Sequence, residues 1–398
     1  MIVKNEEKNL RSCLQSVHPF VDEMVVLDTG SADQTRQIAQ GFGAQVYEFA
    51  WCDDFATARN VALNYVTQDW VLVLDADERL VPEIMPQVQR AIQAQNCLVV
   101  NLIRAEIGAV QSPYSLVSRL FRRHRDLQFS RPYHALIDDS VMRILVAEPH
   151  WQVTALSAVA ILHYGYQTRK ILQGNKLQTA KRAMEKYLNQ HPDDPYVASK
   201  LGALYVEAGE IICGIQLLKR GLTQLLALSP GLKTPNAGVL YELHYHLGIA
   251  YRKQQQLDLA RQHYQKAVEL DILPALKLGA YNNLAGLLKD AGDFSQARAL
   301  YEQVVQIDPG FAMGYYNLGM TLRAQGNYPA AIAAYETAIQ LNPHYPEAHQ
   351  NLGVILFQLG QIQASQKSFQ TAIALYEPHS PAAAEQLRRG LADLGIQL

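Results

Sequence analysis

Two acidic residues, Asp75 and Asp77, end the apolar run WVLVLDADE at residues 70–78. A run this rich in Val and Leu predicts an interior strand of a mostly parallel sheet that is covered on both faces. Open α/β sheets bind their ligands beyond the carboxyl ends of the strands. A carboxylate pair at such an end can hold Mg²⁺ or Mn²⁺, which binds substrate phosphates through its remaining coordination sites.

The same two carboxylates also have a purely structural interpretation, in which they cap the next helix or form a polar turn. On the triplet alone that interpretation is favoured, because Asp-x-Asp sequences are common. The surrounding sequence adds one further acid. The apolar strand EMVVLD, residues 23–28, ends in Asp28, which is therefore expected at the same sheet edge as Asp75.

The elements that would position these acids alternate between strand and helix. GSADQT places Ser31 as an N-cap with Gln34 three residues later, a capping box that predicts a helix to about Phe42. Residues 44–49 predict the next strand. Residues 54–66 predict a helix with one apolar face. We therefore expect one α/β domain over about the first 165 residues.

Four blocks in the first 80 residues, MIVKNEE, VVLDTGS, WCDDFATARN and LDADE, resemble family 2 glycosyltransferases with the GT-A fold in both order and spacing. The resemblance implies that Asp28 contacts the uracil or ribose of a nucleotide sugar and that Arg59 lies near the nucleotide. It implies that Asp77 binds the metal, and that Asp75 supports the ribose or the cation. No GxGxxG after a strand and no GxxxxGK[ST] occurs, which argues against dinucleotide and P-loop sites.

Three candidates near this site keep an alternative interpretation. From the residues alone, Arg59 is equally consistent with a helix-surface ion pair to Asp53 or Asp54. Asn5 and Glu6 follow the first strand and are candidates for the nucleotide-sugar site. Charge matched to a helix N-terminus accounts for at least one of the glutamates in this block.

The first strand is expected to be short. Family members usually carry several residues before the first block, whereas Met1 here leaves Ile2 and Val3 to form the strand. We expect a start codon assigned inside the gene. A version extended upstream is then expected to bind nucleotide more tightly.

The acceptor side offers fewer candidates. An inverting displacement needs a general base, normally a carboxylate, near the acceptor hydroxyl. Related sequences have Glu where this chain has Ala135, so Asp138 or Asp139 would have to substitute, and both are equally consistent with loop acids. His163 in HYGY resembles the family's closing motif. It is a candidate third metal ligand or diphosphate contact, with a core histidine as the equal alternative.

Composition limits the possible partners. A chain of 398 residues is longer than one core usually grows, so two or more domains are expected. Lys and Arg total 35 against 37 acids, so no global basic field points to nucleic acid or an anionic membrane. The local cluster of Arg119, Arg122, Arg123 and Arg125 is best interpreted as a solvated face rather than an anionic-acceptor site.

The cysteines and the hydropathy pattern bear on location. Four cysteines stand without CxxC spacing, and neither a signal sequence nor an 18-residue apolar run occurs. These features predict a reduced, cytoplasmic protein without a transmembrane segment, and they leave peripheral membrane association open.

The second half repeats with a period of 34 residues and resembles the tetratricopeptide repeat (TPR). Gly319 recurs as Gly353, and Tyr335 corresponds to Phe369. Small residues let two antiparallel helices approach, and the aromatic side chain fills the space between them. The predicted organisation is a GT-A domain over 1–165, a connecting helix over 166–194, five repeats over 195–379 with an inserted loop near 229–240, and a capping helix over 380–398.

Asn283, Asn317 and Asn351 recur at one repeat position, where they would project along the concave groove. An amide can donate to and accept from a peptide backbone at once. The repeat array of the O-linked N-acetylglucosamine transferase uses asparagines similarly. Asparagine is also common here in repeats without such a role, and that interpretation is favoured.

The sequence thus predicts an α/β, Rossmann-like GT-A domain followed by an all-α solenoid of TPR helix pairs. The predicted function is metal-dependent, inverting transfer from a UDP-sugar to a protein or glycan acceptor, with Mn²⁺ or Mg²⁺ as the cation. The repeats would bind the acceptor or a protein partner, or mediate self-association. The alternative is a scaffold protein whose glycosyltransferase-like domain is weakly active or inactive.

Overall fold

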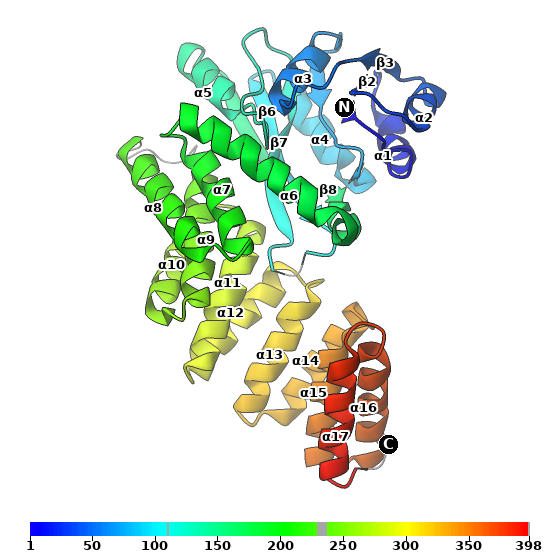
Figure 1. Ribbon diagram of the computed structural model, residues 1–398, viewed down its shortest axis with the longest axis vertical. Coiled ribbons are helices and arrows are strands. Elements are labelled where there is room, and N and C mark those ends of the chain that lie inside the picture. The colour runs from blue at the N-terminus through cyan, green and yellow to red at the C-terminus, as the bar shows by residue number, and fades with distance from the viewer. Residues whose placement is uncertain (110, 229–236, 397–398) are drawn as a thin grey trace. The chain divides into compact units, whose positions relative to one another are not determined.

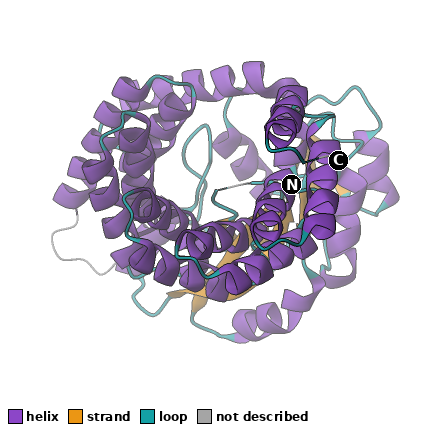
Figure 2. Cartoon of the chain, turned by 90° about the horizontal axis from the view of Figure 1, so that it is seen from below, coloured by secondary structure: helices purple, strands orange, loops and turns teal. Residues whose placement is uncertain are grey.

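The computed structural model describes residues 1–109, 111–228 and 237–396, with the backbone alone for residues 166–177. The chain forms two compact units, one made of Met1–Gln254 with Asp271–Leu276 and the other of Gln255–Leu270 with Lys277–Leu398. The strands belong to the first unit, and the described part of the second unit is helical (Figures 1 and 2). This agrees with the predicted fold class. The predicted inserted loop lies largely outside the described residues.

The first of two sheets contains the apolar strand that ends in Asp28. It is parallel, in the order β1 (Ile2–Val3), β2 (Val25–Asp28) and β3 (Gln45–Glu48). Val3 lies opposite Asp28, so both strands end at the same edge. The helices that accompany this sheet are α1 (Leu10–Val17), α2 (Thr35–Gly41) and α3 (Phe55–Leu63).

The second sheet is mixed, which differs from the predicted parallel arrangement. Its order is β4 (Trp70–Leu72), β7 (Tyr114–Arg122), β6 (Cys97–Glu106), β8 (Gln152–His163) and β5 (Glu78–Leu80). Only β6 and β8 pair in parallel, and β4 pairs antiparallel with β7. The helices of this half are α4 (Met85–Gln93) and α5 (Asp138–Ala147), with short 3₁₀ turns at His18–Phe20 and Pro82–Ile84.

The predicted capping box at Ser31 is wrong, because α2 begins only at Thr35. The Ser31 hydroxyl accepts the backbone N–H of Asn5 at 2.9 Å, and its own N–H donates to Asp28 at 3.0 Å. Asp33 instead accepts the N–H of Thr35 at 3.0 Å. Ser31 thus holds the loop beyond β2 to the end of β1. Asp33, and not Ser31, bonds the first N–H of α2.

Helical hairpins follow the α/β part. The first unit contains α6 (Gly165–Gln190), α7 (Pro195–Glu207), α8 (Ile211–Leu228) and α9 (Ala237–Lys253). The second contains α10 (Leu257–Glu269), α11 (Leu278–Asp290), α12 (Phe294–Ile307), α13 (Ala312–Ala324), α14 (Tyr328–Leu341), α15 (Pro346–Gln358), α16 (Ile362–Tyr376) and α17 (Pro381–Asp393), after a 3₁₀ turn at Pro274–Lys277.

Close helix approach explains the repeated glycines. A Cβ added at Gly319 would lie 2.7 Å from the Tyr335 ring, and one added at Gly353 would lie 2.8 Å from the Phe369 ring. Both rings are almost fully buried. The predicted pairing of a small residue with a large aromatic therefore sets the spacing within these two hairpins.

An ion pair that is largely shielded from solvent joins the α/β part of the first unit to its helices. Arg131 donates from Nε to Asp194 at 2.8 Å, and Asp194 also caps α7 by accepting the N–H of Val197 at 3.0 Å. Tyr133 packs against the apolar cluster that includes Leu188. The start of α7 is therefore fixed to the loop that precedes α5.

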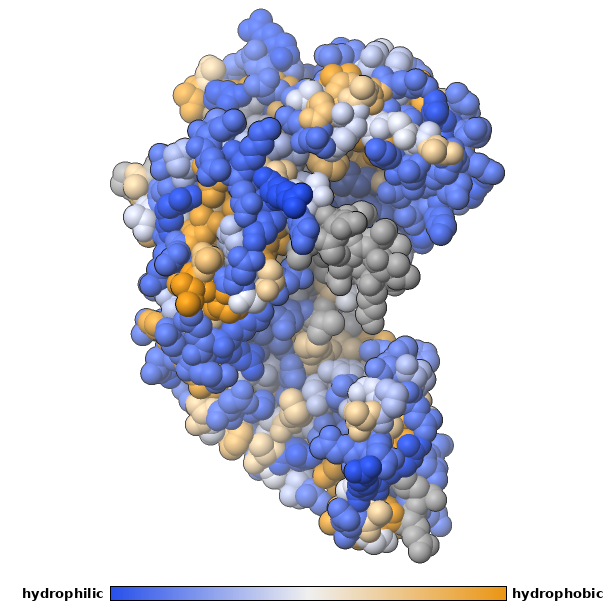
Figure 3. All heavy atoms as spheres, viewed as in Figure 1, coloured by the Kyte–Doolittle hydropathy of each residue, from blue (hydrophilic) through white to orange (hydrophobic). Residues whose placement is uncertain are grey.

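The surface of the first unit carries exposed apolar residues on α8. Most of the surface in Figure 3 is hydrophilic, and apolar residues gather in the region of α8. Ile212 and Leu226 of this helix are 66% and 57% exposed.

We predict a pH-dependent stability contribution from His246 in α9. Burial lowers its pKa to about 4, from an ordinary value of 6.5. Because the unfolded chain takes up this proton below pH 6.5 and the folded chain does not, stability is lost as the pH falls from about 6.5 to 4. Urea unfolding of wild type and His246→Gln at pH 7.5 and pH 5 should show a smaller loss in the variant. Equal losses would contradict this assignment.

Candidate active site

The Asp75 carboxylate lies between two guanidinium groups. Its Oδ1 accepts a hydrogen bond from Nη2 of Arg59 at 3.0 Å, and its Oδ2 accepts one from Nη2 of Arg119 at 2.8 Å. Burial by itself raises the pKa of Asp75, but Arg119 and Arg59 outweigh it and hold that pKa well below the usual range. Asp75 therefore stays ionised, and each of its oxygens has a cationic partner.

Arg59 reaches this position from α3. Its Nη1 also donates to the carbonyl oxygen of Ala135 at 3.1 Å. Arg59 thus connects Asp75, which follows β4, to the loop before α5. The surface pair with Asp53 or Asp54 does not form in the structure. Asp54 caps α3, and Asp53 accepts a neighbouring indole N–H.

A chain of buried charges continues behind Asp75. Glu78 is fully buried and accepts a hydrogen bond from Nη1 of Arg104 at 2.8 Å. Arg104 also forms an ion pair with Glu106 at 2.7 Å. The prediction that Arg119 belongs to a solvated face is wrong, since it is 9% exposed and pairs with Asp75 and Glu78. Charged residues inside apolar strands were the signal for this network, because such charges need partners.

Asp77 and His163, two of the predicted metal ligands, lie side by side. Asp77 Oδ2 is 3.3 Å from His163 Nε2, and His163 Nδ1 is 2.5 Å from Glu106 Oε2. Burial lowers the pKa of His163, but hydrogen bonds to Asp77 and Glu106 outweigh it and raise it to about 9. A Cβ added at Gly165 would lie 2.6 Å from His163 Nε2 and 2.9 Å from Asp77 Oδ2. Only glycine leaves this space open.

Strand pairing explains why these residues meet. Glu78 of β5 lies opposite His163 of β8, and the N–H of Tyr164 donates to the carbonyl of Asp77 at 2.9 Å. Glu106 at the end of β6 also lies opposite His163. Three strand ends therefore converge on the histidine.

Asp28 is 1% exposed and has one oxygen without a partner in the described part of the chain. Its Oδ2 accepts the N–H groups of Gly30 and Ser31 at 3.2 and 3.0 Å, whereas Oδ1 has no hydrogen bond. An unpaired buried oxygen of this kind points to a donor that the chain itself does not supply.

Asn5 and Glu6 serve first to join β1 to the loop after β2. Asn5 Oδ1 accepts the N–H of Ala32 at 2.8 Å, and the N–H of Glu6 donates to the Thr35 hydroxyl at 2.7 Å. Asn5 has a φ of +55°, a left-handed conformation that asparagine tolerates better than most residues. Their predicted contact with the nucleotide sugar stays a prediction.

The two base candidates have different surroundings. Asp139 is paired to Arg131 through both oxygens, at 2.8 and 3.2 Å, and accepts the Ser130 hydroxyl. Asp138 is accessible to solvent and lies 3.4 Å from the Ser118 hydroxyl.

The repeat asparagines are engaged within the chain. Asn283 is buried, and Asn317 Nδ2 donates to Asn282 at 2.8 Å. Asn351 Oδ1 accepts a hydrogen bond from Arg323, and Asn351 Nδ2 donates one to the Tyr316 hydroxyl. A peptide ladder at these positions stays a prediction, and it would require these internal bonds to be exchanged.

Among the described residues, three metal-ligand atoms lie within 4.8 Å of one another only at His124, Asp126 and Glu148. Asp75, Asp77 and His163 do not form such a group. No helix in the described ranges has the length and apolar character needed to span a membrane.

Comparisons with known proteins agree with both halves. A model of glycosyl transferase family 2 matches residues 1–154, and tetratricopeptide repeat models match residues 240–309, 300–333, 319–360 and 346–379. A TPR repeat-containing protein of Synechococcus elongatus is 42% identical over 309 residues, 78% of this chain and 75% of that protein.

Two further similarities cover less. The glycosyltransferase SunS of Bacillus subtilis, derived from prophage SPbeta, is 27% identical over 203 residues, 49% of this chain and 46% of SunS. The solved TPR protein YrrB covers 53% of this chain and all of its own, at 15% identity and a TM-score of 0.41.

We predict that Arg119→Met strongly destabilises the first unit. The substitution keeps much of the side-chain volume but leaves Asp75 and Glu78 without one cation, which should lower the free energy of unfolding by about 3–5 kcal/mol. Arg125→Met is the matched control, because Arg125 is 86% exposed and should change stability by less than about 0.5 kcal/mol. Urea unfolding measures both, and similar values would contradict the network.

Proposed function

We propose, for a chain that belongs to the TPR repeat-containing proteins and carries a family 2 glycosyl transferase domain, that it transfers a sugar from a UDP-sugar to a protein or glycan with inversion. The adjacent Asp77 and His163 side chains carry this proposal. They supply an oxygen and a nitrogen ligand beside the ionised Asp75, at the end of a strand where a diphosphate could bind.

The side chains present fit a divalent cation. Carboxylate oxygen and imidazole nitrogen are both ligands for Mn²⁺, and Glu106 fixes the orientation of the His163 ring from the other side. When bound, the cation would neutralise charge on the diphosphate leaving group. It would have to replace the proton that His163 otherwise carries at neutral pH.

Asp75 has a different role in this proposal. Both of its oxygens are occupied by guanidinium groups, so it positions Arg59 and Arg119 toward the site. Direct binding of the cation or ribose by Asp75 would need one of these pairs to open, and it stays a prediction. The same holds for a direct phosphate contact by Arg59.

Asp28 supports recognition of the nucleoside. Its unpaired Oδ1 can accept a base N–H or a ribose hydroxyl, and such hydrogen bonds to a carboxylate are strong. Because the oxygen is already buried, a matching donor gains a bond at little further desolvation cost for the protein.

Asp138 is the better candidate for the general base. It is accessible, whereas both oxygens of Asp139 are paired with Arg131. The acceptor hydroxyl would attack the anomeric carbon as the bond to the diphosphate breaks, and its proton would pass to Asp138. Attack opposite the leaving group inverts the anomeric centre.

The repeats are proposed to hold the protein acceptor or a partner. The family match of these helices supports this part, since helical repeats of this kind present extended surfaces to other chains. The competing scaffold function makes the opposite prediction for the donor site, because it requires no nucleotide binding.

We predict that this chain binds UDP in the presence of Mn²⁺ and that Asp77→Asn and His163→Gln each abolish the Mn²⁺-dependent part. Calorimetric titration of UDP with and without Mn²⁺ measures this. Asp126→Asn is the matched control, since it alters the separate His124 cluster. Absence of metal-dependent binding in the wild type, and in a version extended upstream, would favour the scaffold.

The base assignment gives a separate prediction. Asp138→Asn should retain UDP affinity while lowering the rate of UDP release from a UDP-sugar by about 10²- to 10⁴-fold. Asp139→Asn should instead reduce thermal stability, because it removes a partner of Arg131. Release assays with a mixture of peptides as acceptors test the Asp138 prediction, and thermal unfolding tests the Asp139 prediction. Full activity in Asp138→Asn would sink its role as base.

A further inference from the structure

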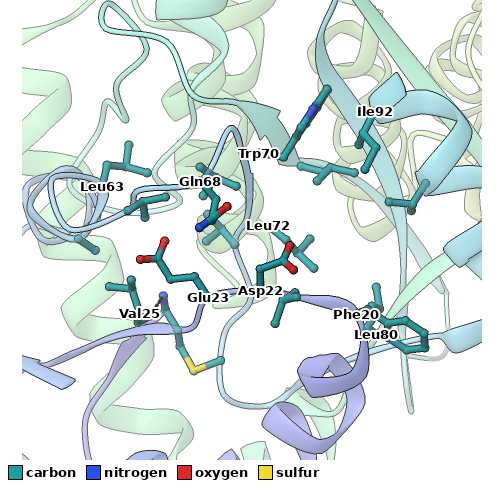
Figure 4. A pocket seen from close by; sticks show the side chains of 18 of the residues that line it. Phe20, Asp22, Glu23, Val25, Leu63, Gln68, Trp70, Leu72, Leu80 and Ile92 are labelled. Carbon is teal, nitrogen blue, oxygen red and sulfur yellow. Dashed lines mark hydrogen bonds between the residues drawn. The ribbon is translucent and has the colours of Figure 1, made fainter. Parts of the chain in front are cut away.

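An acceptor at Asp138 needs polar partners, and an apolar pocket elsewhere in the α/β part does not supply them. That pocket is lined mainly by side chains such as Val25, Trp70 and Leu72 (Figure 4). Neither Asp77 nor Asp138 lines it. A hydroxyl-bearing acceptor leaves water at a cost unless new hydrogen bonds replace those to water. The contacts of the acceptor must therefore come from elements around Asp138.

The start of α7 lies on this side of the α/β part. Arg131 pairs with Asp139 at 2.8 Å, in the same first turn of α5 that carries Asp138. The same guanidinium lies 5.1 Å from the centroid of the Tyr196 ring, which is a cation–π contact. It also pairs with Asp194, the N-cap of α7. Arg131 therefore places the first turn of this repeat helix beside the first turn of α5.

A second cation holds the same ring from within the repeats. Lys200 follows Tyr196 by one helical turn, and its Nζ lies 5.3 Å from the ring centroid. The ammonium group donates to Glu242 Oε1 of α9 at 2.6 Å. The side chains of Lys200 and Glu242 are 25% and 30% exposed. The pair thus holds the ring and still presents a donor and an acceptor to a ligand.

The Tyr196 hydroxyl is available to a ligand. The side chain is half-buried, and its hydroxyl makes no hydrogen bond to the residues that the structure describes. Burial raises the pKa of Tyr196 to about 12, and charges from both parts of the unit act on the phenol, namely those of Lys200, Glu242, Asp138 and Arg131. A phenol in this state is protonated at neutral pH and can donate one hydrogen bond. Tyr196 therefore offers, near Asp138, a donor that the described part of the chain does not use.

We propose, on the basis of the transferase function above, that Tyr196 of the first repeat hairpin binds a sugar acceptor and thereby holds its reacting hydroxyl against Asp138. The phenol donates to one oxygen of the sugar, while a neighbouring hydroxyl gives its proton to Asp138. The oxygen of that hydroxyl bonds to the anomeric carbon of the donor as the bond to the diphosphate breaks. The diphosphate leaves with the electron pair of the broken bond.

The surrounding groups fit a sugar better than a serine or threonine side chain. Tyr196 and Lys200 donate hydrogen bonds, and Asp138 and Glu242 accept them. Each hydroxyl of a sugar both donates and accepts, so one ring with several hydroxyls can use all four groups. A serine or threonine side chain has a single hydroxyl, which Asp138 alone would engage.

Acceptor kinetics of the full chain test this role of Tyr196. Tyr196→Phe removes only the hydroxyl, and Tyr328→Phe makes the same change at the first residue of α14, where the side chain is also half-buried. With UDP-hexoses as donors and methyl hexosides as acceptors, Tyr196→Phe should raise the KM for the methyl hexoside about 3- to 10-fold. Its affinity for UDP with Mn²⁺, and its UDP release without acceptor, should equal those of the wild type. Tyr328→Phe should change none of these values.

Equal KM values for the two variants would overturn the proposal, and so would transfer to a peptide mixture without transfer to methyl hexosides. A loss of UDP affinity in Tyr196→Phe would also overturn it, because the hydroxyl would then act on the donor site. A wild type that binds no UDP with Mn²⁺ would refute the transferase function itself, and this acceptor contact with it. UDP binding therefore distinguishes a failure of the acceptor contact from a failure of the donor site.

Discussion

Charged side chains cross the interior of the α/β part, and those with little access to water must find partners of opposite sign. The members of this network come from α3, the end of β4 and the strands β5 to β8: Arg59, Asp75, Glu78, Arg104, Glu106, Arg119 and His163. Shifting one strand by a residue would turn its charged side chains to the other face. The network therefore constrains the strand register that places Asp77 beside His163.

Several parts of this site could be predicted from sequence because they are local. Asp28 and Asp77 end apolar runs that any strand prediction finds, and the repeat spacing is visible as a 34-residue period. The pairing of Arg104 and Arg119 cannot be predicted in this way, because their partners lie far away in the chain. Pairing of distant strands follows from long-range packing, which periodicity does not reveal.

Local signals also failed where tertiary bonds competed with them. Ser31 has the type and spacing of an N-cap, yet its hydroxyl accepts a backbone N–H from the end of β1. The repeat asparagines Asn317 and Asn351 bond within the array, and their predicted role toward a peptide stays a prediction. The predicted boundary near residue 165 stays a prediction, and the first compact unit includes α6 to α9 as well as the α/β part.

Asp194 performs two tasks with one carboxylate, because it caps α7 and pairs with Arg131 from the loop before α5. A repeat array can in general nucleate at any of its helices. Here the first hairpin gains its full set of bonds only after the preceding loop has taken its final form. During synthesis from the N-terminus, the completed α/β part thus becomes the template on which α7 begins, and the direction of translation matches the direction of assembly.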